Sequence, residues 1–155
     1  MLSAVLDGSP FSLPRIFAFD EGKHAVYVHG AFGGETSRVL GQEDPGDGVP
    51  MTLTVFEMGR LLPADEALEF GVEYASVVVT GRASEVEDPV EALCGLDLIM
   101  EKYAPHLKSG RDYRSIAPDE VARTSVIRID IKAWSGKQKT EADDFPGAYW
   151  FKDVR

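Results

Sequence analysis

The sequence predicts a mainly β protein, a small barrel with one substantial helix inserted late in the chain. Six or seven short apolar stretches are separated by tight turns, which favours a small barrel over a layered parallel sheet. Only residues 89–103 carry apolar side chains at clear helical spacing. With 155 residues, the chain is long enough to bury a core, and we expect one domain over residues 1–155.

The first half of the chain is expected to form four strands. Asp7–Gly8 lies between two apolar runs, a pattern typical of a hairpin. In the third strand, alternation places Tyr27 and His29 on one face. Because the first strand begins at residue 3, either a partner subunit covers this edge or the chain lacks an N-terminal segment. The expected strands cover residues 3–6, 11–19, 25–29 and 51–56.

The second half has the clearest signals for single elements. Residues 57–72 show no clean period and are interpreted as a loop with about a turn of helix, whereas 74–86 is the strongest strand pattern. Asp88 precedes a proline and stands three residues before Glu91, the spacing of a capping box at the start of the 89–103 helix. Residues 125–134 alternate as a further strand with its isoleucines inward.

Composition narrows the classes of partner. A formal charge of −10 argues against nucleic acid or an anionic membrane, and an anionic cofactor would need a local pocket of basic or N–H groups. Cys94 is the only cysteine, so no intramolecular disulfide can form, and within the helix it is expected to be a buried, inert thiol. Three histidines and one cysteine lack metal-ligand spacing. No leader or spanning run is visible, and we expect a cytoplasmic protein.

The stretch most indicative of a function is a glycine-rich turn after His29. A strand ends there, and a short helix follows from Glu35 or Thr36 to Leu40, closed by Gly41. Free backbone N–H groups at such a turn suit an anion such as phosphate. The spacing matches neither a Walker loop nor a dinucleotide fingerprint, so an ordinary strand–turn–helix corner remains the alternative. His29 is either a proton donor or cofactor contact, or a half-buried histidine bonded to a backbone carbonyl.

Five motifs in order give a resemblance over nearly the whole chain. The motifs are Phe11–Ser12–Leu13–Pro14, Tyr27–Val28–His29–Gly30–Ala31, Tyr74–Ala75–Ser76–Val77–Val78–Val79–Thr80–Gly81–Arg82–Ala83, Val86–Glu87–Asp88–Pro89 and Ser135–Gly136–Lys137. With these motifs, the sequence resembles the pyridoxamine 5′-phosphate oxidase-like family of flavin-binding split-barrel proteins, in particular the branch with the nitroimidazole-resistance (Nim) reductases.

The resemblance implies a six-stranded split barrel of Greek-key type that forms a homodimer with FMN at the interface. It also implies an N-terminal segment that this chain lacks. Position by position, it implies a phosphate site beside Val28, His29 and Gly30, with Ser37 and Arg38 as contacts and Thr36 as an alternate. Pro14, Arg15 and Ile16 match a strand along the flavin ring, Ser76 matches a polar ring contact, and Lys137 and Trp150 match tail positions near the cofactor. His29 matches a histidine beside the flavin and is the candidate catalytic residue.

The implied function is an FMN-dependent oxidoreductase that passes electrons from NAD(P)H to a small acceptor, such as a nitroaromatic. Hydroxyl groups, an arginine and a helix N-terminus suit a dianionic phosphate. Donors near the ring would set the flavin potential. One alternative is a non-catalytic split barrel that binds flavin, haem or another ligand, and another is pyridoxamine 5′-phosphate oxidase itself.

Overall fold

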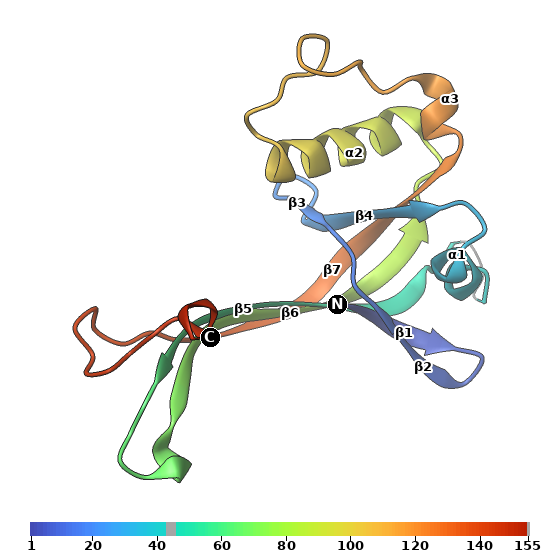
Figure 1. Ribbon diagram of the computed structural model, residues 1–155. Helices are drawn as coiled ribbons and strands as arrows, with labels where there is room; N and C mark the ends of the chain where they lie inside the picture. Colours follow the sequence, from blue (N-terminus) through green and yellow to red (C-terminus); the bar gives the residue numbers. More distant parts are fainter. Residues whose placement is uncertain (43–45, 155) are drawn as a thin grey trace. The chain divides into compact units, whose positions relative to one another are not determined.

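The computed structural model describes residues 1–42 and 46–154, and strands account for most of the ordered elements (Figure 1). The strands are β1 Leu2–Leu6, β2 Ser9–Leu13, β3 Ala18–Asp20, β4 Ala25–Ala31, β5 Val49–Leu62, β6 Gly71–Glu85 and β7 Thr124–Lys139. The helices are α1 Glu35–Leu40, α2 Pro89–Tyr103 and α3 Pro118–Val121, with 3-10 turns η1 Ala67–Glu69 and η2 Phe151–Asp153. The predicted mainly β class and the single substantial helix are confirmed.

All seven strands belong to one sheet with the order β2-β1-β5-β6-β7-β4-β3. The registers of β1 with β2 and β5, and of β4 with β3 and β7, are antiparallel. The count of seven corrects the six strands implied by the resemblance. Within the described ranges the outer strands β2 and β3 do not pair, so the sheet stays open.

The chain divides into two compact units. The first contains Met1–Leu53 and Thr80–Ala133, and the second contains Thr54–Val79 and Trp134–Arg155. The long strands β5, β6 and β7 pass from one unit into the other. The expectation of one domain over residues 1–155 stays a prediction.

In the first unit the hairpin at Asp7–Gly8 forms as predicted. Both residues have positive φ angles, 51° and 76°, as the tight turn of a two-residue hairpin requires. The expected strand over 11–19 was wrong, because β2 ends at Leu13 and β3 begins at Ala18. Pro14 has no N–H to continue a ladder, which fits a break at this point.

Helix α2 packs against β3 and β4 in the first unit (Figure 1). Asp88 Oδ1 accepts a hydrogen bond from the Val90 N–H at 3.0 Å, which confirms the predicted N-cap. Close approach of helix and strand requires Gly95, since a Cβ there would lie 2.8 Å from Cδ1 of Tyr27. Cys94 corrects the expectation of a buried thiol, because it lies on the exposed side of α2.

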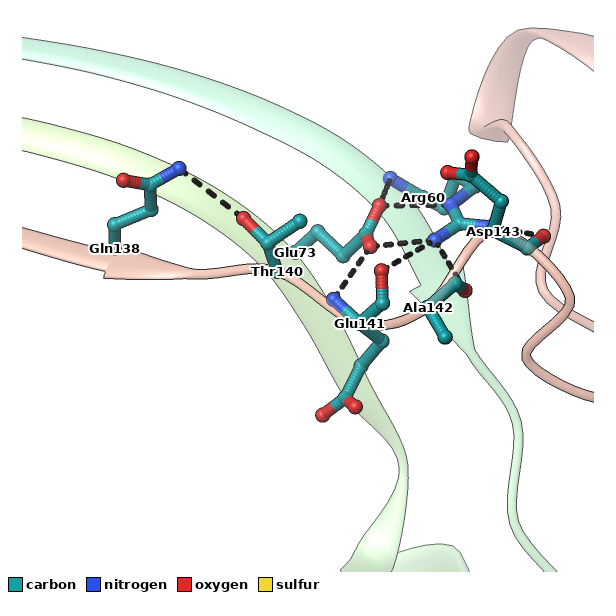
Figure 2. A network of polar contacts seen from close by, with 7 residues as sticks. All are labelled: Arg60, Glu73, Gln138, Thr140, Glu141, Ala142 and Asp143. Atoms are coloured by element: carbon teal, nitrogen blue, oxygen red, sulfur yellow. Dashed lines mark hydrogen bonds and ion pairs between the residues drawn. The ribbon is translucent and has the colours of Figure 1, made fainter.

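In the second unit, β5 extends to Leu62 and β6 begins at Gly71, so the loop expected over 57–72 was largely wrong. This part of β5 lacks the apolar alternation that predicts a strand, and polar contacts hold it in place instead (Figure 2). The Arg60 guanidinium donates to both carboxylate oxygens of Glu73 at 2.7 and 2.8 Å. It also donates to the Glu141, Ala142 and Asp143 carbonyls, and Glu73 accepts from the Glu141 N–H.

The last strand is longer than the 125–134 expected. β7 runs from Thr124 to Lys139, and only its first part carries the alternating apolar pattern that predicts a strand. Val126, Ile127 and Ile129 are buried there, whereas the residues from Ala133 onward are exposed. Pairing with neighbouring strands, rather than burial, therefore extends β7 through the second unit.

Candidate functional site

Arg15 lies directly over Gly30 at the end of β4. A Cβ on Gly30 would be 3.1 Å from Nη2 of Arg15, a tight contact that would move the guanidinium a few tenths of an ångström away from the strand. Nη2 donates a hydrogen bond to Thr36 Oγ1 at 3.0 Å. Nε is buried without a partner, and within the described ranges Arg15 forms no ion pair. A guanidinium with a buried, unused donor is the chemistry of an anion site.

His29 precedes Gly30 on β4 and is half-buried. Its Nδ1 atom is buried and has no hydrogen-bond partner among the described residues. Burial, and secondarily the positive charge of Arg15, lowers the pKa of the imidazole below its usual value of 6.5. His29 is therefore a neutral ring near pH 7, with one nitrogen able to donate and the other able to accept.

Two buried hydroxyl groups belong to the same surroundings. Thr36, 3% exposed, stands in the first turn of α1, where Gly34 takes the N-cap position without a side-chain cap. Ser125, 1% exposed, is the cross-strand partner of Gly30 in the β4–β7 register. Cross-strand partners share a face of the sheet, so the Ser125 side chain belongs to the face over which Arg15 lies. Its Oγ atom is buried without a partner.

These residues form what we call the Arg15 cluster: Arg15, His29, Gly30, Thr36 and Ser125. Among the described residues four buried polar atoms lack a hydrogen-bond partner, and three of them, Arg15 Nε, His29 Nδ1 and Ser125 Oγ, belong to the Arg15 cluster. The fourth, Arg128 Nε, lies 3.0 Å from Asp130 Oδ1 in an ion pair. Buried polar groups are normally hydrogen-bonded, and leaving one unpaired costs about 1–3 kcal/mol. One guanidinium, two hydroxyls and a neutral imidazole suit an anion with several oxygen atoms.

The other predicted phosphate contacts lie differently. Arg38 is exposed, and its Nη2 lies 3.2 Å from Asp7 Oδ2 at the β1–β2 turn. Ser37 is partly buried beside Thr36 in α1, and Val28 is fully buried in β4. Pro14 and Ile16 flank Arg15 in the link between β2 and β3 and are exposed. The cation that the structure brings to Gly30 is therefore Arg15.

Three further predicted residues lie in the second unit. Ser76 Oγ donates to the Lys137 carbonyl at 3.5 Å, and both residues line a pocket of about 390 Å³ on β5, β6 and β7. Glu57 also lines this pocket. Trp150 stands in the tail, 46% exposed, with Lys152 Nζ 5.4 Å from its ring centroid. The structure thus brings Ser76 and Lys137 together.

Sequence reasoning missed Ser125 and gave Arg15 a place only beside the flavin ring. The missing information is the strand register, which pairs Ser125 with Gly30 across 95 positions of sequence. The sequence held one signal for Ser125: it comes just before the apolar residues Val126 and Ile127 of the predicted strand. In the structure all three consecutive residues are buried, so both faces of the strand are covered here. A buried serine in such a strand indicates a hydroxyl that needs a partner.

A second polar cluster joins Tyr27 on β4 to the Glu91 carboxylate on α2. The Tyr27 hydroxyl donates to Glu91 Oε1 at 2.6 Å, and the same oxygen lies 3.0 Å from Lys23 Nζ and 3.0 Å from Arg128 Nη1. Glu91 thus binds the strand instead of closing the capping box that its spacing suggested. We call these four residues the Glu91 cluster. The hydrogen bond from Tyr27, followed by contacts with the two cations, lowers the pKa of Glu91 to about 2.

Burial, and then the bond to Glu91, raises the pKa of Tyr27 to about 12. Arg128 also lies 3.0 Å from Asp130 Oδ1, so its charge is compensated twice. The contacts of the Glu91 cluster join α2 to β4 and β7.

In the described part of the chain, no helix has the length and apolar character of a membrane span.

Comparison with solved structures finds the same fold in flavin proteins. The flavocytochrome Anf3 from Azotobacter vinelandii has a TM-score of 0.74 at 26% identity, over 90% of this chain and 61% of its own. An FAD and haem binding protein from Mycobacterium smegmatis has a TM-score of 0.74 at 23% identity, over 92% and 67%. A candidate 5-nitroimidazole antibiotic resistance protein from Bacteroides thetaiotaomicron has a TM-score of 0.64 at 20% identity, over 87% and 73%.

The chain thus spans about three fifths of the length of the flavocytochrome. No match was found among curated proteins. The model of the family described as pyridoxamine 5′-phosphate oxidase matches residues 1–138, which include every member of the Arg15 cluster. The chain belongs to the pyridoxamine 5′-phosphate oxidase family.

Proposed function

We propose that this protein binds a flavin, FMN in the first instance, through its phosphate at the Arg15 cluster. The observation that carries the proposal is that Arg15 Nε and Ser125 Oγ, both buried and without a partner among the described residues, belong to the face of the sheet on which Gly30 lies open. His29, whose Nδ1 is also unpartnered, precedes Gly30 on β4 and faces the other side of the strand. A phosphate offers several strong acceptor oxygens and a negative charge in one compact group. It would give partners to the guanidinium and hydroxyl donors together.

The charges of the cluster favour a dianion. Arg15 brings a positive charge with no carboxylate paired to it, and the neutral His29 adds a donor without a second charge. Glu35, the acid closest in sequence to Thr36, is exposed to solvent. The residues present therefore fit a phosphate group, whether it ends FMN or forms part of FAD.

The resemblance also implies contacts with the flavin ring. Pro14 and Ile16 flank Arg15 and offer exposed apolar and backbone surface. Ser76 and Lys137 line one pocket in the second unit and offer a hydroxyl and an ammonium. Trp150 offers an exposed aromatic face in the tail. We propose Pro14 and Ile16 as ring contacts, and from the resemblance alone we propose that Ser76, Lys137 and Trp150 contact bound flavin. Donors near the ring would adjust its reduction potential.

The bound flavin would accept a hydride from NAD(P)H and pass electrons to a small acceptor, for which a nitroaromatic is one candidate. The names of the flavocytochrome and the FAD and haem binding protein support flavin redox chemistry. His29 would lie beside the cofactor, holding a proton at one ring nitrogen. Replacement His29→Ala should impair turnover more than flavin retention, and unchanged kinetics would remove His29 from the mechanism.

We propose further that two copies of the chain associate. The strands of the second unit expose large apolar side chains, among them Phe56 at 61% and Trp134 at 65% exposure. Exposed apolar groups of this size on β5 and β7, two strands of one sheet, are typical of an interaction surface. Light scattering should give the mass of a dimer, and a monomer would count against both the dimer and an interfacial flavin.

The test is the visible spectrum of the purified protein, followed by titration with FMN, FAD and riboflavin. The fluorescence of FMN should be quenched when it binds to the protein. Riboflavin should bind about ten- to a hundredfold more weakly if the phosphate supplies charge-assisted hydrogen bonds. Equal affinity for FMN and riboflavin would remove the phosphate from the Arg15 cluster. A haem Soret band without flavin absorbance would favour haem, the cofactor shared by two of the similar structures' names.

A further inference from the structure

A groove of about 610 Å³ lies in the first unit, outside the Arg15 cluster. The first turns of α2, the helix α3 and the turn at Phe32 form its walls. Its volume falls within the range of roughly 300–1,000 Å³ typical of small-molecule sites. We call it the Phe32 groove.

Apolar side chains make up most of the Phe32 groove. Ala92, 4% exposed, belongs to the core beneath it, and Leu93, Ile116 and Val121 add partly buried apolar surface. Phe32 is 69% exposed, although it is a large aromatic residue. An apolar body in the groove would remove part of this surface from water, which favours binding in proportion to the area covered.

Two carboxylates give the groove its charge. Glu85 ends β6 and Glu87 follows in the link to α2, and both line the groove. Among the described residues, neither carboxylate forms an ion pair or a side-chain hydrogen bond. The described lining includes no lysine, arginine or histidine. The lining of the groove thus carries two acidic residues without an ion pair beside apolar surface. The same two residues also line a neighbouring pocket that includes Arg82 and Arg128.

We propose that the Phe32 groove binds a small amphipathic amine. Its aromatic or aliphatic body would contact Phe32 and Leu93, and its ammonium group would face Glu85 and Glu87. A second copy of the chain fits this groove less well, because two-fold pairing through the groove would bring acidic groups together in a chain of charge −10. No member of the Arg15 cluster lines the groove, so binding of an amine there can be measured without bound flavin.

The first test needs no variant. Phenethylamine, 2-phenylethanol and phenylacetate share a phenyl body and differ in charge, and each is titrated into the full-length protein by calorimetry. Phenethylamine should bind most tightly and phenylacetate least. Equal binding of the three probes, or no binding of phenethylamine, would overturn the proposal.

The second test removes the charge. The double variant Glu85→Gln/Glu87→Gln should weaken phenethylamine binding by up to about fivefold for each carboxylate, as expected for partly exposed ion pairs. The matched control Asp97→Asn/Glu101→Gln removes two exposed charges from α2 outside the groove and should leave affinity unchanged. Equal losses in the control and the double variant would reduce the effect to net charge and overturn the assignment.

The third test removes the aromatic wall. Phe32→Ala should weaken binding of phenethylamine and 2-phenylethanol by a similar factor, because both lose the same apolar contact. Phe32 is exposed and the variant is expected to fold, which circular dichroism checks. If Phe32→Ala instead lowers the mass in solution while phenethylamine affinity is unchanged, the groove is a contact between copies and the proposal fails.

Discussion

Tyr27 and His29 lie two residues apart on β4, and their surroundings differ in one respect. Around Tyr27, the Glu91 carboxylate accepts from the phenol and contacts two cations, Lys23 and Arg128. Around His29, the charged group is the guanidinium of Arg15, and no carboxylate is paired with it. The first cluster compensates its own charges, whereas the second has donors left over.

The difference separates a structural role from a binding role. In the Glu91 cluster, removal of any member leaves another charge or hydroxyl unpaired, so the cluster stabilises the fold. In the Arg15 cluster, the unpaired donors cost free energy in the ligand-free protein, and the proposed anion would give them partners. Four predictions test this contrast, from the largest expected effect to the smallest.

The largest effect is expected from Glu91→Ala. Loss of the carboxylate leaves Tyr27 and Arg128 without their shared acceptor, and the free energy of unfolding should fall by about 2–3 kcal/mol. Urea unfolding followed by circular dichroism measures this change. Glu101→Gln is the control on the same helix and should change stability by less than about 0.5 kcal/mol. A loss below that level in Glu91→Ala would contradict the structural role.

Arg15→Gln should have the opposite balance of effects. FMN affinity should fall about ten- to a hundredfold, because a charge-assisted contact to phosphate is lost. The stability of the flavin-free protein should change by less than about 1 kcal/mol, since Arg15 has no ion pair to lose. Arg38→Gln, which breaks only the exposed pair with Asp7, is the matched control and should retain FMN affinity. Equal losses in both variants would contradict the special role of Arg15 and would fit either the expected Arg38 contact or an effect of long-range charge.

The pH dependence of stability gives the next effect, at both ends of the scale. Glu91 has a pKa of about 2 in the fold against 4.5 ordinarily, so the unfolded chain binds its proton first and stability falls as pH drops from 4.5 toward 2. Tyr27 has a pKa of about 12 against 10, so its contribution is lost as pH rises between these values.

Glu91→Gln should flatten the acid side by roughly 1–2 kcal/mol, and Tyr27→Phe should flatten the alkaline side. The measurement is the free energy of unfolding across pH in each variant and in the parent. Glu73, whose pKa its bonds from Arg60 lower to about 2, contributes to the acid side in all three proteins and cancels in the difference. Parallel curves for parent and Glu91→Gln would show that the Glu91 proton is not linked to folding.

The smallest effect is expected from Ser125→Ala. The buried hydroxyl has no partner without an anion, so its removal should leave stability unchanged or raise it by up to about 1 kcal/mol. FMN affinity should fall severalfold in the same variant. Thermal unfolding with and without FMN measures both terms, and a destabilised flavin-free variant would indicate a partner for Ser125 in the fold itself.

Local chemistry made part of this fold predictable. The Asp7–Gly8 turn, the Asp88 cap of α2 and the strand expected over 74–86 depend on residues close together in sequence, and all three were confirmed, the strand as β6 Gly71–Glu85. The outer part of β5 was missed because the Arg60–Glu73 contacts hold it, and such contacts have no periodicity along the chain. Cys94 was expected to be buried in the helix but is exposed, because helical spacing alone did not show which side of α2 it lies on.

By itself, the sequence determined the mainly β class, the single long helix and the glycine turn after His29. Those features follow from apolar alternation, caps and turn residues that act over a few positions. Only the tertiary structure decided that Arg15 lies over Gly30 and that Ser125 pairs with it across β4 and β7. The reason is physical: strand register brings residues together from distant parts of the chain, and buried donors show their lack of partners only after the chain has folded.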